Sequence, residues 1–366
     1  MRTMNLNVIA REAGVTAMTV SRVLRGQNMG RRRDAKGRAD RVRAIAKRLG
    51  YRRNMAPVAM ARGRFDTVGI LESADWSRNH LPEDRKRGIQ DGLAPHGLHL
   101  MIFRMADAEL AKPDSVPLTL QNRMVDGFLL DYIIAYPQRL DALIRRYALA
   151  AVWMNSKHKA DCVHPADREG IVSAVQFLVE LGHRRIAFGD FRWEQQVFAH
   201  YSAADRRAGY EQTMRRAGLP PQMIAVPERI AYCDRATVFL PYLRAAERPT
   251  ALITPGLTEG LAAIRAATVA GLRIPEDLAL ITVTGDVTYT RSLRVAALEL
   301  PEYEVGYKAA EMLVKKIQRP TETLAPVAVP LKLDGKEFCL PPQKAKTVKA
   351  RRRRRGGAKV NKGGGT

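Results

Sequence analysis

Polar side chains able to bind a polyanion cluster in one short segment of the chain. The hydroxyls of Thr16, Thr19 and Ser21 and the guanidinium of Arg25 suit contacts with phosphate oxygens. Arg22 lies among them, and its guanidinium can form two parallel hydrogen bonds with the O6 and N7 atoms of a guanine. The segment therefore has the chemistry to bind phosphates and read a base edge. A solvated surface arginine is the alternative interpretation of Arg22.

An apolar stripe with the helical period precedes this segment. Its members are Leu6, Ile9, Ala10 and Ala13. Asn5 is suited to cap the start of that helix, because its side-chain oxygen can accept from free backbone N–H groups. Gly14 ends it, because glycine adopts the positive φ that a tight helix exit requires.

Two further helices are expected after this turn. Thr16 can cap the second helix, which would turn Val20, Val23 and Leu24 inward and Ala17, Met18 and Arg22 outward. A third stripe consists of Val42, Ile45, Ala46 and Leu49 and closes at Gly50. This order describes a helix-turn-helix module, whose second helix enters the DNA major groove. A small helical bundle without a nucleic-acid role is the alternative.

The charge distribution favours the first interpretation. Residues 1–64 contain 17 Lys and Arg residues but only 3 acidic ones, and residues 344–366 contain 10 basic residues and no acidic one. Residues 65–343 contain 34 of each sign, so the net charge of +24 comes from the two ends. A small folded unit with this excess of positive charge is expected to bind a polyanion.

Composition also limits the class of protein. No run of 18 apolar residues occurs, so no membrane span is expected, and the N-terminal segment lacks the apolar core of a secretory signal. Cys162, Cys233 and Cys339 are odd in number and far apart, which favours free thiols in a reducing cytoplasm. The histidines show no metal-ligand spacing, so no metal and no cofactor are expected.

Several motifs carry a resemblance to a known family. Ala10, Ala13-Gly14-Val15 and Thr19-Val20-Ser21-Arg22-Val23-Leu24 resemble the signature of LacI/GalR-type bacterial transcription regulators. The motifs at 181–186, 206–210 and 275–277 resemble later landmarks of the same family. The resemblance implies a homodimer that binds a double-stranded, palindromic DNA operator under the control of a small-molecule effector. The DNA contacts it implies are Leu6, Thr16, Ala17, Met18, Thr19, Ser21, Arg22, Arg25, Asn54, Ala56 and Met60.

Four domains follow from this resemblance. A helix-turn-helix domain spans 1–50, a hinge helix 51–64, a two-lobed effector-binding and dimerisation domain 65–343, and a disordered basic tail 344–366. Met60 would wedge between base steps of the minor groove, whereas an ordinary linker is the alternative for this segment. Residues 27–41 include an unusually long loop with Arg31-Arg32-Arg33 and Gly37, which either contacts the DNA backbone or is an insertion without a defined role. The tail either adds non-specific affinity for phosphates or has no role.

The remaining pattern is α/β. Buried strands are expected at 67–71, 98–103, 125–131, 148–154, 186–188, 251–254 and 279–283, with helices between them. Alternation of this kind predicts parallel sheets covered on both faces. The family resemblance makes this body two doubly wound lobes, like those of a periplasmic sugar-binding protein, and a helix within 298–317 resembles the last family helix.

Ligands of such lobes bind beyond the carboxyl ends of the parallel strands. That rule nominates Asp75, Trp76, Asp131, Tyr132 and Trp193, and the resemblance adds Asp167, Arg206 and Asp286. Aromatic faces with carboxylates and an arginine suit a sugar, although a surface or structural role is the alternative for each of them. The chain departs from the family at Gly256-Leu257 and at Thr284, where acidic groups are usual. His183 is expected to be a buried framework residue.

The most specific interpretation is a DNA-binding regulator, a repressor, whose effector is a sugar. No catalytic signature appears, so no enzyme activity is expected. A solute-binding protein of a sugar transport system is the alternative; the missing signal peptide and the basic first domain oppose it. An enzyme built on the same fold is a third possibility, for which no catalytic residues can be named.

Overall fold

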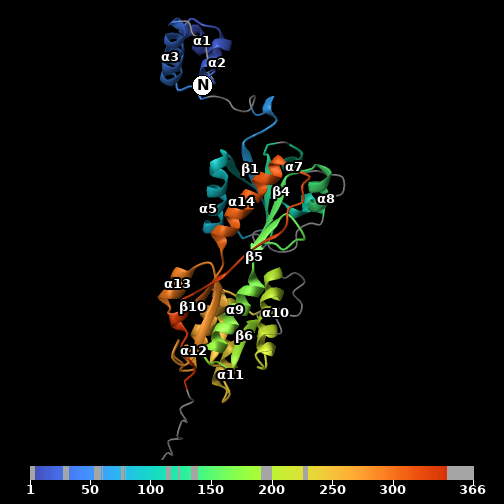
Figure 1. Ribbon diagram of the computed structural model, residues 1–366, viewed down its shortest axis with the longest axis vertical. Helices are drawn as coiled ribbons and strands as arrows, with labels where there is room; N and C mark the ends of the chain where they lie inside the picture. Colours follow the sequence, from blue (N-terminus) through green and yellow to red (C-terminus); the bar gives the residue numbers. More distant parts are fainter. Residues whose placement is uncertain are drawn as a thin grey trace, which may run out of the picture. The chain divides into compact units, whose positions relative to one another are not determined.

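The computed structural model describes residues 5–27, 33–52, 59, 61–75, 78, 80–112, 117–122, 124–132, 139–190, 200–225 and 230–343. The chain divides into two compact units, Met1–Asp66 and Thr67–Thr366 (Figure 1). Seven expectations concern residues outside the described ones. These are the DNA contacts of Asn54, Ala56 and Met60, the ligand contacts of Trp76 and Trp193, the loop arginines 31–32 and the tail 344–366.

The first unit, called the headpiece below, contains the three predicted helices. These are α1 Leu6–Ala13, α2 Ala17–Leu24 and α3 Arg33–Arg48 (Figure 1). Asn5 Oδ1 accepts from the backbone N–H groups of Asn7 and Val8 at 3.1 and 3.2 Å, and Gly14 follows α1 with φ 67°. Thr16 Oγ1 accepts from the Thr19 N–H at 3.2 Å and caps α2. The predicted caps and glycine turn are confirmed.

The expected long loop before the third helix is wrong from Arg33 onward. Residues 33–41 belong to α3, and Gly37 lies inside the helix. Ala35 and Ala39 are buried, with 5% and 7% exposure, and extend the inner face of Val42 toward the start of the helix. Alanine favours helix strongly but contributes little to a hydrophobic stripe, so the periodicity of this turn was hidden by its charged neighbours.

The second unit, called the body, contains two six-stranded sheets. Their strand orders are β11-β5-β4-β3-β1-β2 and β12-β10-β9-β8-β6-β7. The first sheet contains β1 Thr67–Ser73, β2 His99–Met105, β3 Gly127–Asp131, β4 Ala151–Met154, β5 Cys162–Pro165 and β11 Val327–Val329. The second contains β6 Ile186–Asp190, β7 Gln222–Ala225, β8 Ala251–Thr254, β9 Ala279–Thr284, β10 Ala296–Glu299 and β12 Lys332–Asp334. The predicted doubly wound α/β architecture is confirmed.

Helices cover both sheets. They are α5 Glu83–Leu93, α6 Asp107–Ala111, α7 Leu118–Gln121, α8 Arg139–Arg146, α9 Asp167–Glu180, α10 Tyr201–Arg216, α11 Arg235–Arg244, α12 Leu257–Val269, α13 Val287–Ser292 and α14 Glu302–Gln318. Short 3₁₀ turns occur at Ala94–His96, Tyr232–Asp234 and Lys336–Phe338. None of these described helices has the length and apolar character that crossing a membrane requires.

Parallel pairing brings the carboxyl ends of the central strands to one edge of each sheet. In the first sheet β1 pairs with both neighbours, so that Leu71 lies opposite Phe103 and Leu130. In the second sheet β8 and β9 pair from Ala251 to Thr254. Among the described strands, only β12 joins antiparallel, against β10. Side chains that follow β1 and β3, or β6, β8 and β9, therefore gather at the edge where ligands bind in such sheets.

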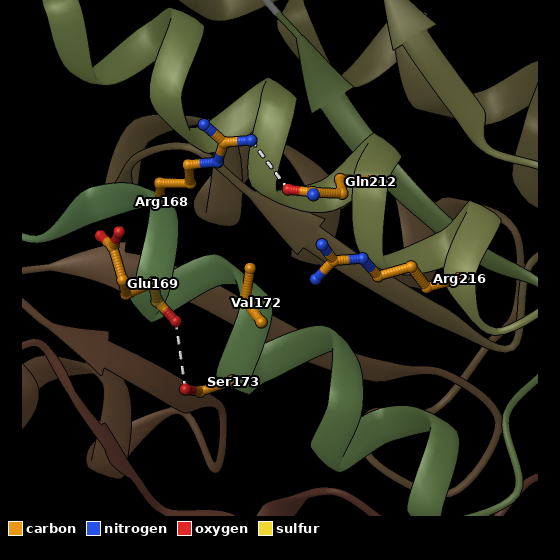
Figure 2. A pocket seen from close by; sticks show the side chains of 6 residues that line it. All are labelled: Arg168, Glu169, Val172, Ser173, Gln212 and Arg216. Atoms are coloured by element: carbon orange, nitrogen blue, oxygen red, sulfur yellow. Dashed lines mark hydrogen bonds between the residues drawn. The ribbon is translucent and has the colours of Figure 1, made fainter.

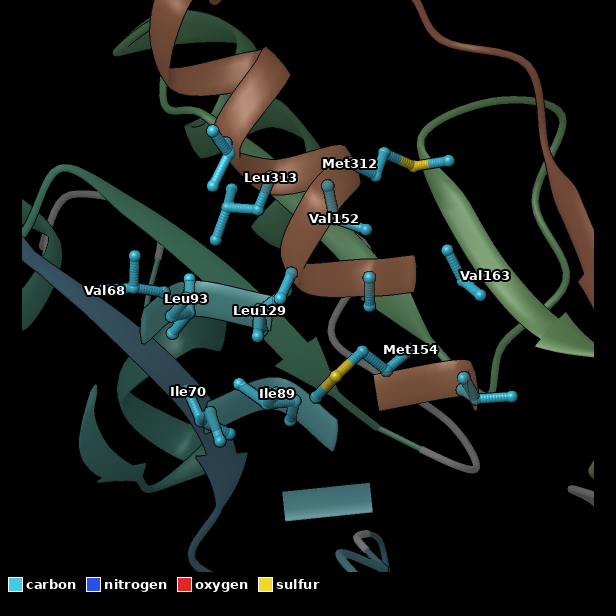
Figure 3. Packing of buried hydrophobic residues seen from close by; sticks show 14 of the residues in the cluster. Val68, Ile70, Ile89, Leu93, Leu129, Val152, Met154, Val163, Met312 and Leu313 are labelled. Atoms are coloured by element: carbon cyan, nitrogen blue, oxygen red, sulfur yellow. The ribbon is translucent and has the colours of Figure 1, made fainter. Parts of the chain in front are cut away.

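The chain passes between the two sheets three times, after β5, after β10 and after β11. Helix α14 consequently packs on the first sheet although it follows the strands of the second. Met312 and Leu313 of α14 lie against Leu129 and Val152 in one buried apolar cluster (Figure 3). The two lobes are thus joined by a helix that is folded into the core of the first.

Helices α5 and α14 approach each other closely at two glycines. A Cβ atom on Gly88 would lie 2.1 Å from the Tyr303 carbonyl oxygen, and one on Gly306 would lie 2.1 Å from the Arg85 carbonyl oxygen. Only residues without a side chain allow this approach. It brings Arg85 against the first turn of α14, where the candidate ligand site of the first lobe begins.

Candidate nucleic-acid interface and ligand site

The outer face of α2 is the exposed surface that sequence analysis predicted for base contacts. Val20 and Val23 are buried, with 0% and 2% exposure, whereas Met18 is 67% exposed. Arg22 is exposed as well, and its side chain has no ion pair or hydrogen bond within the described part of the headpiece. A guanidinium and a thioether therefore stand on a capped, two-turn helix whose other face is fixed in the core.

Two of the predicted DNA contacts are less accessible than expected. Ala17 and Leu6 are half-buried and pack against the headpiece core, because each lies close to the buried stripe of its own helix. Ala17 is therefore turned outward only in part.

The residues suited to phosphate contacts frame α2. Thr16 and Thr19 share a hydrogen bond between their hydroxyls at 3.0 Å, so that both are held at the start of the helix. Arg25 is exposed just beyond its last turn, and Ser21 is half-buried. Such groups can position the helix on the sugar-phosphate backbone without reading sequence.

In the body, Asp131 ends β3 inside a buried ionic cluster. Its Oδ1 atom lies 3.4 Å from Nη1 of Arg85, and its Oδ2 atom accepts from the His80 N–H at 3.2 Å. Arg85 also donates from Nε to Glu302 at 2.8 Å. The Asp131 and Arg85 side chains are 0% exposed. The cluster ties the end of a strand to α5 and to the first turn of α14.

The electrostatics of this cluster are unbalanced, because two carboxyl groups share one guanidinium. Burial raises the pKa of Asp131 to about 7, against the opposing effect of Arg85. The prediction that Asp131 lies ready for a ligand is thus not supported, since both of its oxygens already have partners inside the protein. Sequence analysis missed Arg85 and Glu302.

The second lobe places a different carboxylate at the corresponding edge. Arg206 of α10 donates from Nε to Oδ1 of Asp167, the first residue of α9, at 2.7 Å, and also donates to the Pro255 carbonyl after β8. Asp167 is 1% exposed, and its Oδ2 atom has no hydrogen-bond partner in the described structure. This atom is a buried acceptor that a ligand donor could satisfy. The structure therefore brings Asp167 and Arg206 together.

The other predicted ligand contacts have local roles. Asp75 lies beyond β1 and is exposed, with Arg78 Nε 3.5 Å from its carboxylate. Asp286 caps α13 by accepting from the Tyr289 N–H at 3.0 Å. Tyr132 is 1% exposed within an apolar cluster, so the expectation of an aromatic plate is wrong for this residue.

His183 is the framework residue that was expected. It is 1% exposed, and its ring nitrogens lie 2.9 Å from Thr250 Oγ1 and 3.0 Å from the Leu340 carbonyl oxygen. Burial lowers its pKa, so the neutral ring is favoured.

His200 is a second histidine that sequence analysis did not single out. Its Nε2 atom donates to the Asn155 carbonyl oxygen at 2.7 Å, and its Nδ1 atom lies 2.8 Å from Ser202 Oγ. Burial lowers the pKa of His200 to about 4, which keeps the ring neutral. Because His200 precedes α10 and Asn155 follows β4, this hydrogen bond joins the two lobes close to Asp167.

A groove of about 470 Å³ lies apart from these residues, on the surface between α9 and α10 (Figure 2). Arg168 donates to Gln212 Oε1 at 2.8 Å across it, and Arg216 extends toward it from the end of α10. The groove includes none of the predicted ligand residues.

Comparison with known proteins agrees with this two-part architecture. Residues 5–54 match the family described as bacterial regulatory proteins, lacI family, and residues 175–335 match the periplasmic binding protein-like domain. Catabolite control protein A of Priestia megaterium is 26% identical over 341 residues, which cover 91% of this chain and 99% of that protein. The transcriptional repressor CytR of Escherichia coli K12 is 26% identical over 324 residues, which cover 85% and 89%.

Solved structures show the same fold. The crystal structure of the Lac repressor dimer bound to operator and an anti-inducer matches with a TM-score of 0.74 and 19% identity, over 93% of this chain and 100% of that one. The complex of the transcriptional regulator CelR with cellobiose matches with a TM-score of 0.57 and 22% identity, over 90% and 98%.

A helix-turn-helix headpiece followed by two parallel-sheet lobes defines a class of DNA-binding transcription regulators. The chain belongs to the lacI family of bacterial regulatory proteins, with a periplasmic-binding-protein-like effector domain. This is a family of regulators and not of enzymes.

Proposed function

We propose that this regulator binds an approximately palindromic operator as a homodimer in the cytoplasm and represses transcription. We further propose that a small polyhydroxylated effector of the sugar class, bound between the lobes, controls its operator affinity. The observation that carries the proposal is the free, outward Arg22 on a helix fixed by the Thr16 cap and by buried Val20. A guanidinium presented in this way suits a guanine edge in the major groove.

Homodimerisation is supported by apolar side chains left on the surface of the body. Val269 of α12 is 53% exposed, Tyr289 of α13 is 43% exposed, and Ile102 on edge strand β2 is 52% exposed. A second copy would cover such groups, and twofold symmetry would present two headpieces to two operator half-sites. The similar Lac repressor structure is a dimer bound to operator.

The effector class follows from the buried ion pair between the start of α9 and α10 in the second lobe. Asp167 provides an unsatisfied acceptor and Arg206 a partly exposed donor, with 12% side-chain exposure. A neutral polyol supplies both donors and acceptors, so it fits this pair better than an anion does. Relatives include the ribose operon repressor of Haemophilus influenzae and the CelR–cellobiose complex.

Effector binding would act through the segments that join the lobes. A ligand held by both lobes favours one angle between them. Helix α14 follows a strand of the second sheet and packs in the core of the first lobe, so it would transmit a change in that angle to the first lobe. A change in lobe angle would alter the spacing of the two headpieces and thereby the operator affinity.

The test is selection of bound sequences from random duplex DNA by the purified full-length protein, with and without candidate ligands. We expect an enriched palindrome with a conserved guanine, whose enrichment changes with one ligand. A thermal-shift screen of sugars, nucleobases and organic acids should identify that ligand, and Asp167→Asn should abolish its stabilising effect. Absence of any enriched sequence at moderate ionic strength would refute the proposal for DNA, and absence of any stabilising compound would refute it for the effector.

A further inference from the structure

The outer surface of α3 carries more positive charge than the helix-turn-helix contacts require. Between Arg33 and Arg48 the helix has seven basic residues and two acidic ones. All the basic residues from Lys36 onward are exposed. The buried face of α3 consists of alanines and Val42, so packing of the core does not explain why the exposed face is basic.

Few acidic groups neutralise these cations within the described headpiece. Arg43 Nη1 lies 2.9 Å from Asp40 Oδ1, and Arg48 pairs with Glu12 of α1. Lys36, Arg41 and Lys47 form no ion pair there. The unpaired charge remains available to an external partner.

Three of the cations share one line along the helix. Lys36, Arg43 and Lys47 are spaced seven and four residues apart, which places them on the same face at about 1.5 Å of rise per residue. We call these three residues the α3 stripe. It extends over roughly 16 Å, a length along which duplex DNA presents several phosphates on each strand.

The α3 stripe lies on a different line of the helix from the residue that pairs with α1. Successive residues of a helix are about 100° apart around its axis, so Arg48 lies roughly 120° from Lys36 and roughly 100° from Lys47. Arg48 is the residue that meets Glu12 of α1. Lys36, Arg43 and Lys47 are all exposed, so the α3 stripe is open to a partner in solution.

We propose that the α3 stripe is a second phosphate-binding surface of the headpiece, which contacts the backbone of duplex DNA without reading bases. The lysine ammonium groups would replace condensed counterions along the backbone next to the groove that α2 enters. This inference rests on the proposed DNA binding. It adds a sequence-independent contribution to the affinity for DNA, separate from the contacts of α2.

The test compares two full-length double variants that lose the same charge. Lys36→Gln with Lys47→Gln removes two members of the α3 stripe. Arg11→Gln with Arg41→Gln removes two exposed cations outside it, since Arg11 belongs to α1 and Arg41 lies about 140° around α3 from Lys36. Affinity for the selected operator and for a scrambled duplex is measured between 50 and 200 mM salt. Each lost phosphate contact should lower the salt slope by about 0.9, so the wild type should lose about tenfold more affinity than the stripe variant over this range.

The ratio of operator to scrambled affinity should stay within about twofold of the wild type, because phosphate contacts carry no sequence information. Lys36→Arg with Lys47→Arg should retain the wild-type slope, which separates a charge effect from damage to the helix. An unchanged slope in the glutamine variant, or an equal decrease in the control variant, would overturn the proposal. A wild type that binds no duplex would refute the proposed function instead.

Discussion

Arg22 is the side chain whose chemistry is most specific in the headpiece. Its guanidinium is exposed and lacks a protein partner in the described structure, so it can form a bidentate contact with guanine. Arg22→Ala should weaken operator binding by about 1–3 kcal/mol and relax the preference at one base pair. Competition binding against operators substituted at each position measures both effects.

Arg25 provides the matched comparison, because it is exposed one turn later at the end of α2. Arg25→Ala should weaken binding to operator and to unrelated duplexes alike, as loss of a phosphate contact does. If Arg22→Ala behaved in the same uniform way, Arg22 would be a phosphate contact and the assignment wrong.

Asp131 makes the stability of the body depend on pH. Its pKa is raised to about 7 in the folded chain, well above the ordinary value, because burial outweighs the single shared guanidinium. Between pH 4 and 7 the folded state therefore binds more protons than the unfolded state, and this group lowers stability as the pH rises. Asp131→Asn should gain stability relative to the wild type across that interval and level off above pH 7.

Denaturant unfolding of the full chain at several pH values measures this difference. Asp84→Asn is the control, because Asp84 is 52% exposed and pairs with Arg87 on the surface. Its difference from the wild type should stay flat from pH 5 to 8. A flat difference for Asp131→Asn as well would show that the buried carboxyl is ionised throughout.

At the scale of elements, hydrophobic period and caps predict those helices and strands that have a buried face of several residues. The caps at Asn5 and Thr16 and the strands β1, β3, β8 and β9 all follow from such patterns. Strands β5, β7 and β12 have three or four residues that include polar side chains or proline, and β11 has only three residues, so none of them contains a clear apolar run. The placement of α14 on the first sheet depends on long-range packing that chain order does not reveal.

The candidate site was predictable to the same degree. Asp131 follows from the rule for strand ends and Asp167 from the family resemblance, but the buried state of Asp131 depends on Arg85. That arginine lies in a highly charged helix, where a solvated side chain is the ordinary expectation. Its position four residues before Ile89 and eight before Leu93, on the buried face of α5, is the signal that could have identified it.

Substitutions at two glycines of the headpiece, one after α1 and one inside α3, test where these helices begin and end. Gly14 has φ 67°, a region that a side chain disfavours by about 1–2 kcal/mol, and a Cβ there would meet no atom within 4 Å. Gly14→Ala should therefore destabilise the headpiece by about 1 kcal/mol after the loss of chain entropy is included. Hydrogen exchange of the α1 and α3 amides in the full-length protein measures the change.

Gly37→Ala should change the stability of the headpiece in the opposite direction and stabilise it. Gly37 lies inside α3, and a Cβ there would also meet no atom within 4 Å. Alanine is favoured over glycine in a helix interior by about 1 kcal/mol, so the variant should be more stable than the wild type. A destabilising effect at Gly37 would mean that the first turns of α3 are not helical.

At the scale of the whole molecule, the proposed operator binding by a homodimer requires a second copy to cover apolar surface of the body. Val269 ends α12 with 53% exposure, and Leu261 lies eight residues earlier on the same helix with 37% exposure. Val269→Lys would place a charge in this interface, so the protein should become monomeric in size-exclusion chromatography with light scattering. Loss of the paired headpieces should then weaken operator binding by about a hundredfold, because the second half-site is no longer bound intramolecularly.

Met124→Lys is the matched control for this change. Met124 is 46% exposed just before β3 of the first sheet, so the same charge is added at another apolar surface position. This variant should stay dimeric and keep its operator affinity. Both variants should retain the wild-type affinity for short duplexes that contain a single half-site, because α2 is unchanged. A dimeric Val269→Lys protein would place the contact between copies on another surface, and a monomeric wild type with full operator affinity would exclude dimerisation as the basis of binding.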